Sequence, residues 1–404
     1  MPRLPRSLVS GDVRRHNLSL VLEHIVGSGP SARSEIAEAT GLTRGAVTAL
    51  VAALTGAGVL REQAPEPGAA GRPVTRLELD AAAVAIVVAQ LDADAATALV
   101  TSVAGEELFR IVEQHGRPMG DPERVLDVLA LVVAEALEHA RAVGRRVTEL
   151  PIVMFAPVGG EPPVVLADTD LGWGVVDVLG ELRARLPQLG AEVPMSLVSD
   201  GWLAALAERA LVPGTDALLY LKSNSGIGGA IVSNGLALEG AHGVGGSLGH
   251  LPVVPDGVLC ECGQHGCLVT VAGPDRLLAL AGLGDLVAER GLSAALDELS
   301  ARITAGEPLA AGAWREALPW IARTLQILSL ATDPELIVIG GFWASHAASI
   351  EVVYRANRPN IPASVGGMAI PPLVAGRLGD DAALLGAVRA ARDRLIADPE
   401  RLGL

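Results

Sequence analysis

The sequence predicts an α/β protein that begins with an all-α, winged helix-turn-helix domain. Three observations lead to this fold class. Apolar residues recur with helical spacing up to residue 56 and are followed by two short alternating segments; strand and helix patterns alternate from residue 81; and a second strand, turn and strand begins at residue 217. We expect an N-terminal domain over 1–80, a first α/β lobe over 81–198 and a second lobe over 199–404, whose C-terminal helix returns to the first lobe.

Three helices are predicted in the N-terminal domain. The first ends at the Gly-Ser-Gly-Pro turn over 27–30, and the second, over 35–39, ends at the Thr-Gly-Leu turn that follows it. Thr43 can cap the third helix with its hydroxyl group. The apolar stripes of the first and third helices are Leu18, Val21, Leu22 and Ile25, and Val47, Leu50, Val51 and Leu54. Helix, tight turn, helix is the spacing of helix-turn-helix DNA-binding proteins, although an ordinary three-helix bundle can show the same pattern.

The candidate DNA-binding residues lie at the start of the third helix and in a loop beyond it. Those near the N-terminus of the helix, where it would enter the major groove, are Thr43, Arg44, Gly45 and Thr48. Segments 59–62 and 74–79 alternate like two strands, and the loop over 65–73 between them contains Arg72. Such a wing can place Arg72 in the neighbouring minor groove, whereas an isolated loop arginine is more often a solvated charge.

Charge is distributed unevenly along the chain. Residues 1–79 contain nine Arg, no Lys and seven acidic residues, a net charge of +2; the remainder contains 22 basic and 39 acidic residues, a net of −17, and the two sum to −15. The N-terminal domain is therefore the part expected to face double-stranded DNA, because the acidic body repels it. No apolar segment reaches about 18 residues and the N-terminus does not resemble a signal peptide, so we expect a cytoplasmic protein without a membrane partner.

All three cysteines fall within eight residues, at Cys260, Cys262 and Cys267, and His250 stands ten residues before the first of them. Zn²⁺ in a closed structural site takes four tetrahedral N or S ligands, which this set supplies. The alternative is a group of three buried, reduced cysteines without metal. His265 is a rival fourth ligand, but it lies inside the loop that the cysteines close, whereas His250 follows glycines that let a separate segment approach. An odd number of cysteines cannot pair fully within the chain, which agrees with a reducing compartment.

Two α/β units are predicted after residue 81. The elements of the first are strands over 85–91, 96–103, 108–112, 152–155 and 195–198 and helices over 122–143 and 173–186. Those of the second are strands over 217–222, 230–232 and 336–339, with a glycine-rich bend over 223–229. Two related α/β units usually close on a ligand in the cleft between them.

Several motifs together resemble the ROK family of repressors, open reading frames and sugar kinases. They are Gly71-Arg72-Pro73 after the helix-turn-helix, Ser225 to Gly228, Gly249-His250, the cysteine motif and Gly340-Gly341. The resemblance covers nearly the whole chain, and its N-terminal domain is similar to the regulator branch, which includes xylose and N-acetylglucosamine repressors. It implies an actin-like ATPase (hexokinase-type) body of two lobes, a structural zinc on His250 and the three cysteines, a homodimer or homotetramer, and a near-palindromic DNA operator.

The chain also departs from this family. Its kinases carry an Asp-x-Gly-x-Thr phosphate loop, which here is Asp-Ala-Asp-Ala-Ala over 92–96, without the glycine that lets phosphate approach. The two glycine turns that resemble nucleotide loops are on their own more often hairpins. The sugar-binding Asn-Asp pair is Ser199-Asp200, where Asp200 occupies the position of the kinase base, although it can also cap the helix that follows. Two sugar-binding glutamates are replaced by Ser247 and Val269. The candidate ligand-binding residues are Ser199, Asp200, Ser247 and His250.

The sequence therefore predicts a transcriptional regulator, a repressor that responds to a sugar-like effector and is not an enzyme. No residue is expected to be catalytic. Two alternatives remain open: an ATP-dependent sugar kinase with an appended DNA-binding domain, and a DNA-bound scaffold controlled by a protein partner.

Overall fold

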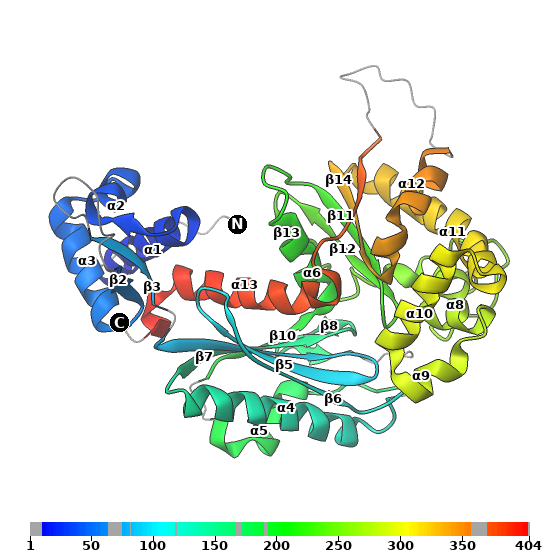
Figure 1. Ribbon diagram of the computed structural model, residues 1–404, viewed down its shortest axis with the longest axis horizontal. Helices are drawn as coiled ribbons and strands as arrows, with labels where there is room; N and C mark the ends of the chain where they lie inside the picture. Colours follow the sequence, from blue (N-terminus) through cyan, green and yellow to red (C-terminus); the bar gives the residue numbers. More distant parts are fainter. Residues whose placement is uncertain are drawn as a thin grey trace.

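The computed structural model describes residues 10–63, 75–80, 82–117, 119–166, 172–189, 193–356 and 370–402. At one end of the molecule lies the N-terminal domain, and two α/β lobes make up the rest (Figure 1). No helix within these ranges is both long and apolar enough to cross a membrane.

The N-terminal domain packs three helices against a small antiparallel sheet. The helices are α1 (Ser10–Ser28), α2 (Arg33–Thr40) and α3 (Arg44–Gly56), and the strands β1 (Ser31–Ala32), β2 (Leu60–Glu62) and β3 (Arg76–Leu79) are ordered β1-β3-β2. The predicted apolar stripes of α1 and α3 are buried. Gly41 ends α2 in the left-handed conformation, with φ of 70°, which a glycine adopts without strain and which turns the chain sharply into α3. The predicted N-terminal fold is confirmed, and the loop that contains Arg72 lies outside the described residues.

The first lobe contains a mixed five-stranded sheet of order β10-β7-β4-β5-β6. Its strands are β4 (Val84–Leu91), β5 (Ala95–Ser102), β6 (Glu107–Gln114), β7 (Arg146–Met154) and β10 (Met195–Ser199). The first three form the predicted antiparallel meander, while β7 and β10 run parallel to their neighbours. Helices α4 (Pro122–Ala142) and α5 (Val178–Arg185) cover one face of this sheet (Figure 1).

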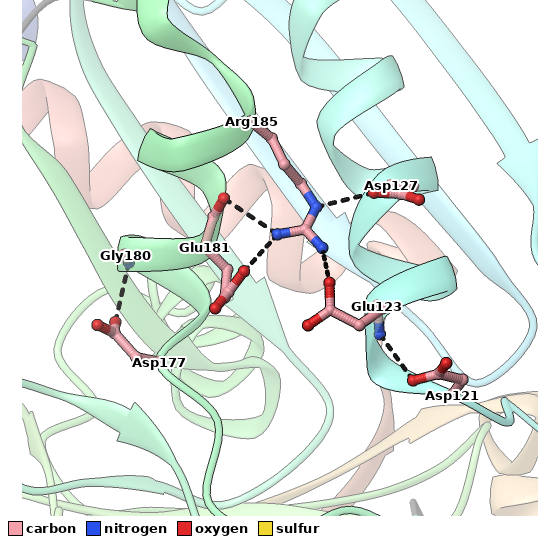
Figure 2. A network of polar contacts seen from close by, with 7 residues as sticks. All are labelled: Asp121, Glu123, Asp127, Asp177, Gly180, Glu181 and Arg185. Atoms are coloured by element: carbon pink, nitrogen blue, oxygen red, sulfur yellow. Dashed lines mark hydrogen bonds and ion pairs between the residues drawn. The ribbon is translucent and has the colours of Figure 1, made fainter.

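Helix α5 begins five residues later than its predicted start at residue 173. Trp173 is instead buried in the preceding turn, where its indole N–H donates to the carbonyl oxygen of Gly120 at 3.0 Å. Asp177 caps the helix by accepting a hydrogen bond from the backbone N–H of Gly180 at 2.9 Å. Arg185 then ties α5 to α4, because its guanidinium binds Asp127 at 2.8 Å and also Glu123 of α4 and Glu181 of α5 (Figure 2).

The second lobe contains another mixed five-stranded sheet, of order β13-β12-β11-β14-β15. Its strands are β11 (Leu218–Ser223), β12 (Ile227–Ser233), β13 (Leu236–Ala237), β14 (Leu336–Gly341) and β15 (Leu373–Ala375). One side of this sheet is covered by α7 (Val269–Ala272), α8 (Pro274–Leu280), α9 (Gly284–Arg290), α10 (Leu292–Ala305), α11 (Pro308–Thr332) and α12 (Ala347–Ala356), as Figure 1 shows.

Two helices, α6 (Asp200–Arg209) and α13 (Ala382–Ala397), lie between the sheets (Figure 1). Helix α13 contacts α6 and also β4 and β7 of the first lobe. The two helices approach closely because Gly386 has no side chain; a Cβ there would overlap the carbonyl oxygen of Leu203. After α13 a short 3₁₀ turn, η5 (Pro399–Leu402), contacts α1. One apolar cluster therefore runs from the N-terminal domain through α13 into the second lobe.

Candidate metal centre, ligand cleft and DNA-reading face

The structure brings His250 and the three cysteines together. Their ligand atoms all lie within 4.8 Å of one another, with Sγ of Cys260 3.7 Å from Nδ1 of His250 and Sγ of Cys262 3.6 Å from Sγ of Cys267. Zinc–sulfur bonds of about 2.3 Å in a tetrahedron separate the ligand atoms by about 3.7 Å, so the spacing fits that ion. The rival ligand His265 lies apart, with Nδ1 3.0 Å from the carbonyl oxygen of Gly257.

The loop that holds the cysteines depends on glycines for its path. Gly266 has a φ of 76°, and a Cβ at this position would overlap the carbonyl oxygen of Val254. Isolated bridges join Pro252 to Cys267 and Leu259 to His265, and no regular helix or strand lies between the 3₁₀ turn η2 (Leu248–His250) and α7. The shape of this segment therefore depends on short turns and on the contacts among its four candidate ligand side chains.

The three thiols differ in acidity because they are crowded. Burial and the neighbouring thiols raise the pKa of Cys267 to about 12. For Cys262, burial opposes ionisation, but hydrogen bonds from the backbone of Gln264 and from the other two cysteines outweigh it and lower the pKa to about 7. The set as it stands retains protons that a bound divalent cation would displace.

The four candidate ligand-binding residues line a single cavity of about 70 Å³ at the mouth of the metal loop. Ser199 and Asp200 come from the junction of β10 and α6, Ser247 and His250 from the segment that ends in η2. The glycine bend over 225–229 and Phe155 also line the cavity. Val269 is not among the described residues that line this cavity.

Sequence reasoning gave no role to Lys222, which lies near the end of β11 and also lines this cavity. Its ammonium group forms an ion pair with the carboxylate of Asp200, and the two side chains are only 12% and 8% exposed. Burial opposes the charge on Lys222, but the attraction of Asp200 outweighs it, so that the net effect raises the pKa of the lysine. Asp200 is the first residue of α6, so the N-cap position belongs to Ser199, whose side chain makes no capping hydrogen bond. Lys222 is the only lysine among 404 residues, which is the signal that could have drawn attention to it.

A second, larger cavity of about 680 Å³ lies between the lobes, around the turn that joins β4 to β5. Asp94 of this turn accepts a hydrogen bond at 2.6 Å from the backbone N–H of Leu292, the first residue of α10. Gln90 donates to both carboxylate oxygens of Asp92, at 2.9 and 2.8 Å. Burial raises the pKa of Asp92 to about 7. Asp297 and Asp380 also line the cavity, together with three arginines, of which Arg110 is held by Glu107 and Asp381.

The exposed N-terminal end of α3 carries the four remaining candidates. Thr43 caps the helix by accepting a hydrogen bond from the backbone N–H of Ala46 at 3.2 Å, and Arg44, Gly45 and Thr48 are exposed. Among the described residues Arg44 forms no ion pair, whereas four other arginines of the domain do, namely Arg15 with Asp12, Arg33 with Glu62, Arg61 with Glu78 and Arg76 with Glu35. This surface therefore presents an uncompensated guanidinium at the start of a helix.

Comparison with known proteins assigns most of the chain to a family. Residues 94–394 match the model of the ROK family. A glucokinase of Streptomyces coelicolor is 25% identical over 315 residues, 74% of this chain and 95% of that protein, and a kanosamine kinase of Amycolatopsis mediterranei is 28% identical over 269 residues, 64% of this chain and 86% of that protein.

Solved structures resemble the chain over different lengths. A ROK family transcriptional regulator, described as a homologue of the E. coli MLC protein, is 24% identical, has a TM-score of 0.73, and covers 97% of this chain and 98% of its own. A ROK hexokinase from Thermus thermophilus is 28% identical, has a TM-score of 0.55, and covers 76% of this chain and 97% of its own. The predicted actin-like, hexokinase-type fold of the two lobes is confirmed.

Proposed function

The chain belongs to the ROK family, and we propose that it acts as a DNA-binding transcriptional regulator that has lost kinase activity. The observation that carries this proposal is the N-terminal helix-turn-helix with its exposed Arg44. This domain precedes the matched residues 94–394, and the hexokinase structure covers only 76% of the chain, whereas the regulator covers 97%. These differences in coverage support an added DNA-reading function rather than a bare kinase.

Thr43, Arg44, Gly45 and Thr48 would contact the major groove, and Arg72 a neighbouring minor groove. Arginine recognises guanine through two parallel hydrogen bonds, for which an unpaired, exposed guanidinium at a helix N-terminus is suited. In a homodimer or homotetramer two such helices would lie about one DNA turn apart, or a multiple of it, on a near-palindromic operator.

Loss of kinase activity is supported by charge at two positions. Asp200, which occupies the position of the family's catalytic base, is bound by the ammonium group of Lys222, so a substrate hydroxyl would have to compete with this cation for the carboxylate. Asp94 replaces a glycine of the phosphate loop and is tied to Leu292 across the cavity. The carboxylates of Asp94 and Asp297 would disfavour a phosphate group beside this turn, although Arg290 and Arg377 line the same cavity.

We propose that His250, Cys260, Cys262 and Cys267 hold a structural zinc ion, which would fix the geometry of the loop without taking part in a reaction. His250 also lines the small cavity. The ion would thereby position one wall of the effector site. An effector bound by Ser199, Asp200, Ser247 and His250 would be sugar-like, because these groups exchange hydrogen bonds with hydroxyls.

The test of DNA binding begins with capture of genomic fragments by the purified protein, followed by titration of the recovered sequence. We expect Arg44→Gln to weaken binding by roughly 5- to 150-fold, the equivalent of about 1–3 kcal/mol for one bidentate contact. Arg323→Gln, on an exposed part of α11 far along the chain, is the matched control and should bind like the native protein.

A coupled assay for ADP release decides between the regulator and the alternative kinase. We expect no sugar-dependent release with a panel of hexoses, amino sugars and their derivatives. Turnover that depends on sugar and disappears in Asp200→Asn would establish the kinase instead. Calorimetric titration of the same panel tests the effector site, and heats that persist unchanged in Asp200→Asn would move that site elsewhere.

A further inference from the structure

A third cavity, of about 450 Å³, lies at the other end of the first lobe, away from the metal loop and both cavities described above. Four of the residues that line it are arginines, which come from separate parts of the chain: Arg141 near the end of α4, Arg145 just before β7, Arg146 at the first position of β7, and Arg401 in η5. We call it the arginine cavity. None of the described residues that line it is an aspartate or a glutamate.

Arg401 and Arg146, two of the arginines of the cavity, are held by the protein in different ways. Arg401 binds Glu149 at 2.7 Å and Asp398 at 3.3 Å. Glu149 is shared with Arg394, so it cannot balance Arg401 alone. Arg146 donates instead to the backbone carbonyl oxygens of Arg401 and Leu402, at 3.4 and 2.6 Å, which leaves its charge uncompensated by these bonds.

Arg141 is available to a ligand. It is exposed on the last turn of α4, and no ion pair of its side chain is found among the described residues. No acidic residue occurs between Glu138 and Glu149, a segment that contains three arginines, although the part of the chain after residue 79 carries 39 acidic and only 22 basic residues. A cluster of one sign in a body of the opposite sign creates a local field that attracts anions.

The walls of the cavity also restrict the kind of anion. Guanidinium groups bind carboxylates and phosphates through paired hydrogen bonds. The remaining lining includes the apolar side chains of Leu137, Leu189, Val193 and Pro194, and the volume lies within the range of about 300–1,000 Å³ typical of small-molecule sites. A recessed site with apolar walls suits a small molecule better than the backbone of a DNA duplex, which contacts projecting surfaces.

We propose that the arginine cavity binds a small anionic ligand, a phosphate or carboxylate attached to an apolar group. Two residues of the arginine cavity are connected to the N-terminal domain through η5. Arg146 and Arg401 hold η5, and the same segment contacts α1 through Arg15, which lies 3.7 Å from Asp398 and 3.5 Å from Glu400. A bound ligand would therefore stabilise the contact between η5 and α1 of the DNA-reading domain.

The test is calorimetric titration of the full chain with phenyl phosphate and with inorganic pyrophosphate, and with phenol as the uncharged counterpart. We expect phenyl phosphate to bind with a stoichiometry of one per chain and phenol not to bind. Arg141→Gln should weaken binding roughly tenfold or more, as expected for a lost hydrogen bond to a charged group. Arg146 is left intact, because it anchors η5. Arg323→Gln, which removes an arginine from outside the cavity, should bind phenyl phosphate like the native chain.

Absence of saturable binding by both anions, or equal loss in Arg141→Gln and Arg323→Gln, would overturn the proposal. A third result identifies the other source of phosphate. If neither anion binds, but Arg141→Gln weakens binding to a random-sequence duplex and lowers the salt dependence by about one phosphate contact, the site serves DNA and the small-molecule assignment fails. The titrations with free anions contain no DNA, so their outcome does not depend on the proposed regulatory function.

Discussion

Replacing Asp92 by asparagine should stabilise the protein at alkaline pH but not at acid pH. Burial raises the pKa of this carboxyl from 3.8 to about 7. The folded protein therefore keeps the proton at pH values where the unfolded chain has already lost it. The associated stability is fully present below about pH 4 and is lost as the pH rises to about 7. Asparagine does not ionise, so the variant escapes this loss.

The size of the effect follows from the two pKa values. A rise from 3.8 to about 7 corresponds to about 4 kcal/mol, at about 1.4 kcal/mol for each pH unit. Asp92 is half-buried, so solvent screening reduces this upper value to roughly 2 kcal/mol. The hydrogen bond with Gln90 can be kept, because the side-chain oxygen of Gln90 has no partner and a flip of that amide would let it accept from the new asparagine.

Urea denaturation followed by tryptophan fluorescence, at pH 5 and pH 8, measures the outcome. The free energy of unfolding of Asp92→Asn minus that of the native protein should increase by roughly 1–2 kcal/mol from pH 5 to pH 8. Asp275→Asn, at an exposed aspartate on α8, is the matched control for the chemical change. The reasoning would be refuted if this difference in unfolding free energy were the same at both pH values. It would also be refuted if Asp275→Asn showed an equal change with pH.

Three further changes test other parts of the structure. Cys262→Ser should lower the zinc content from about one ion per chain and should also lower the melting temperature, since zinc binding in small structural sites is worth about 10–16 kcal/mol. Native protein that contains no zinc would contradict the metal assignment. Glu208→Ala should cost roughly 2–4 kcal/mol, because it leaves two backbone N–H groups, of Arg377 and Leu378, without their buried acceptor, whereas Glu208→Gln keeps an acceptor and should cost less. Gly386→Ala should destabilise the contact between α13 and α6, and urea midpoints equal to those of the native chain would show that the helices can separate.

The features predicted correctly from sequence are those that neighbouring residues determine. The buried stripes of α1 and α3 follow helical spacing, so a short-range pattern was sufficient to predict them. The clustering of the three cysteines with His250 was predictable because the cysteines lie within eight residues. The features that were missed depend on distant segments. Lys222 meets Asp200 because β11 and the end of β10 face one cavity, and Asp94 meets Leu292 across 198 residues of sequence.

The same reason explains the error at α5 and the missed arginine cavity. The predicted helix included Trp173, but Trp173 finds a buried hydrogen-bond partner in Gly120, and Asp177 caps α5 just before its first residue. The arginine cavity combines α4, β7 and η5, whose proximity no local pattern encodes.

The single lysine has a practical consequence for the chemistry of this protein. Acetylation, methylation and ubiquitin-type conjugation act on exposed lysine amines, and the one lysine here is buried in an ion pair. Reagents that couple through side-chain amines would find the same obstacle. Formaldehyde, which joins proteins to DNA largely through such amines, should trap this protein on chromosomes poorly, so a negative crosslinking experiment would report on its surface chemistry and not on its affinity for DNA.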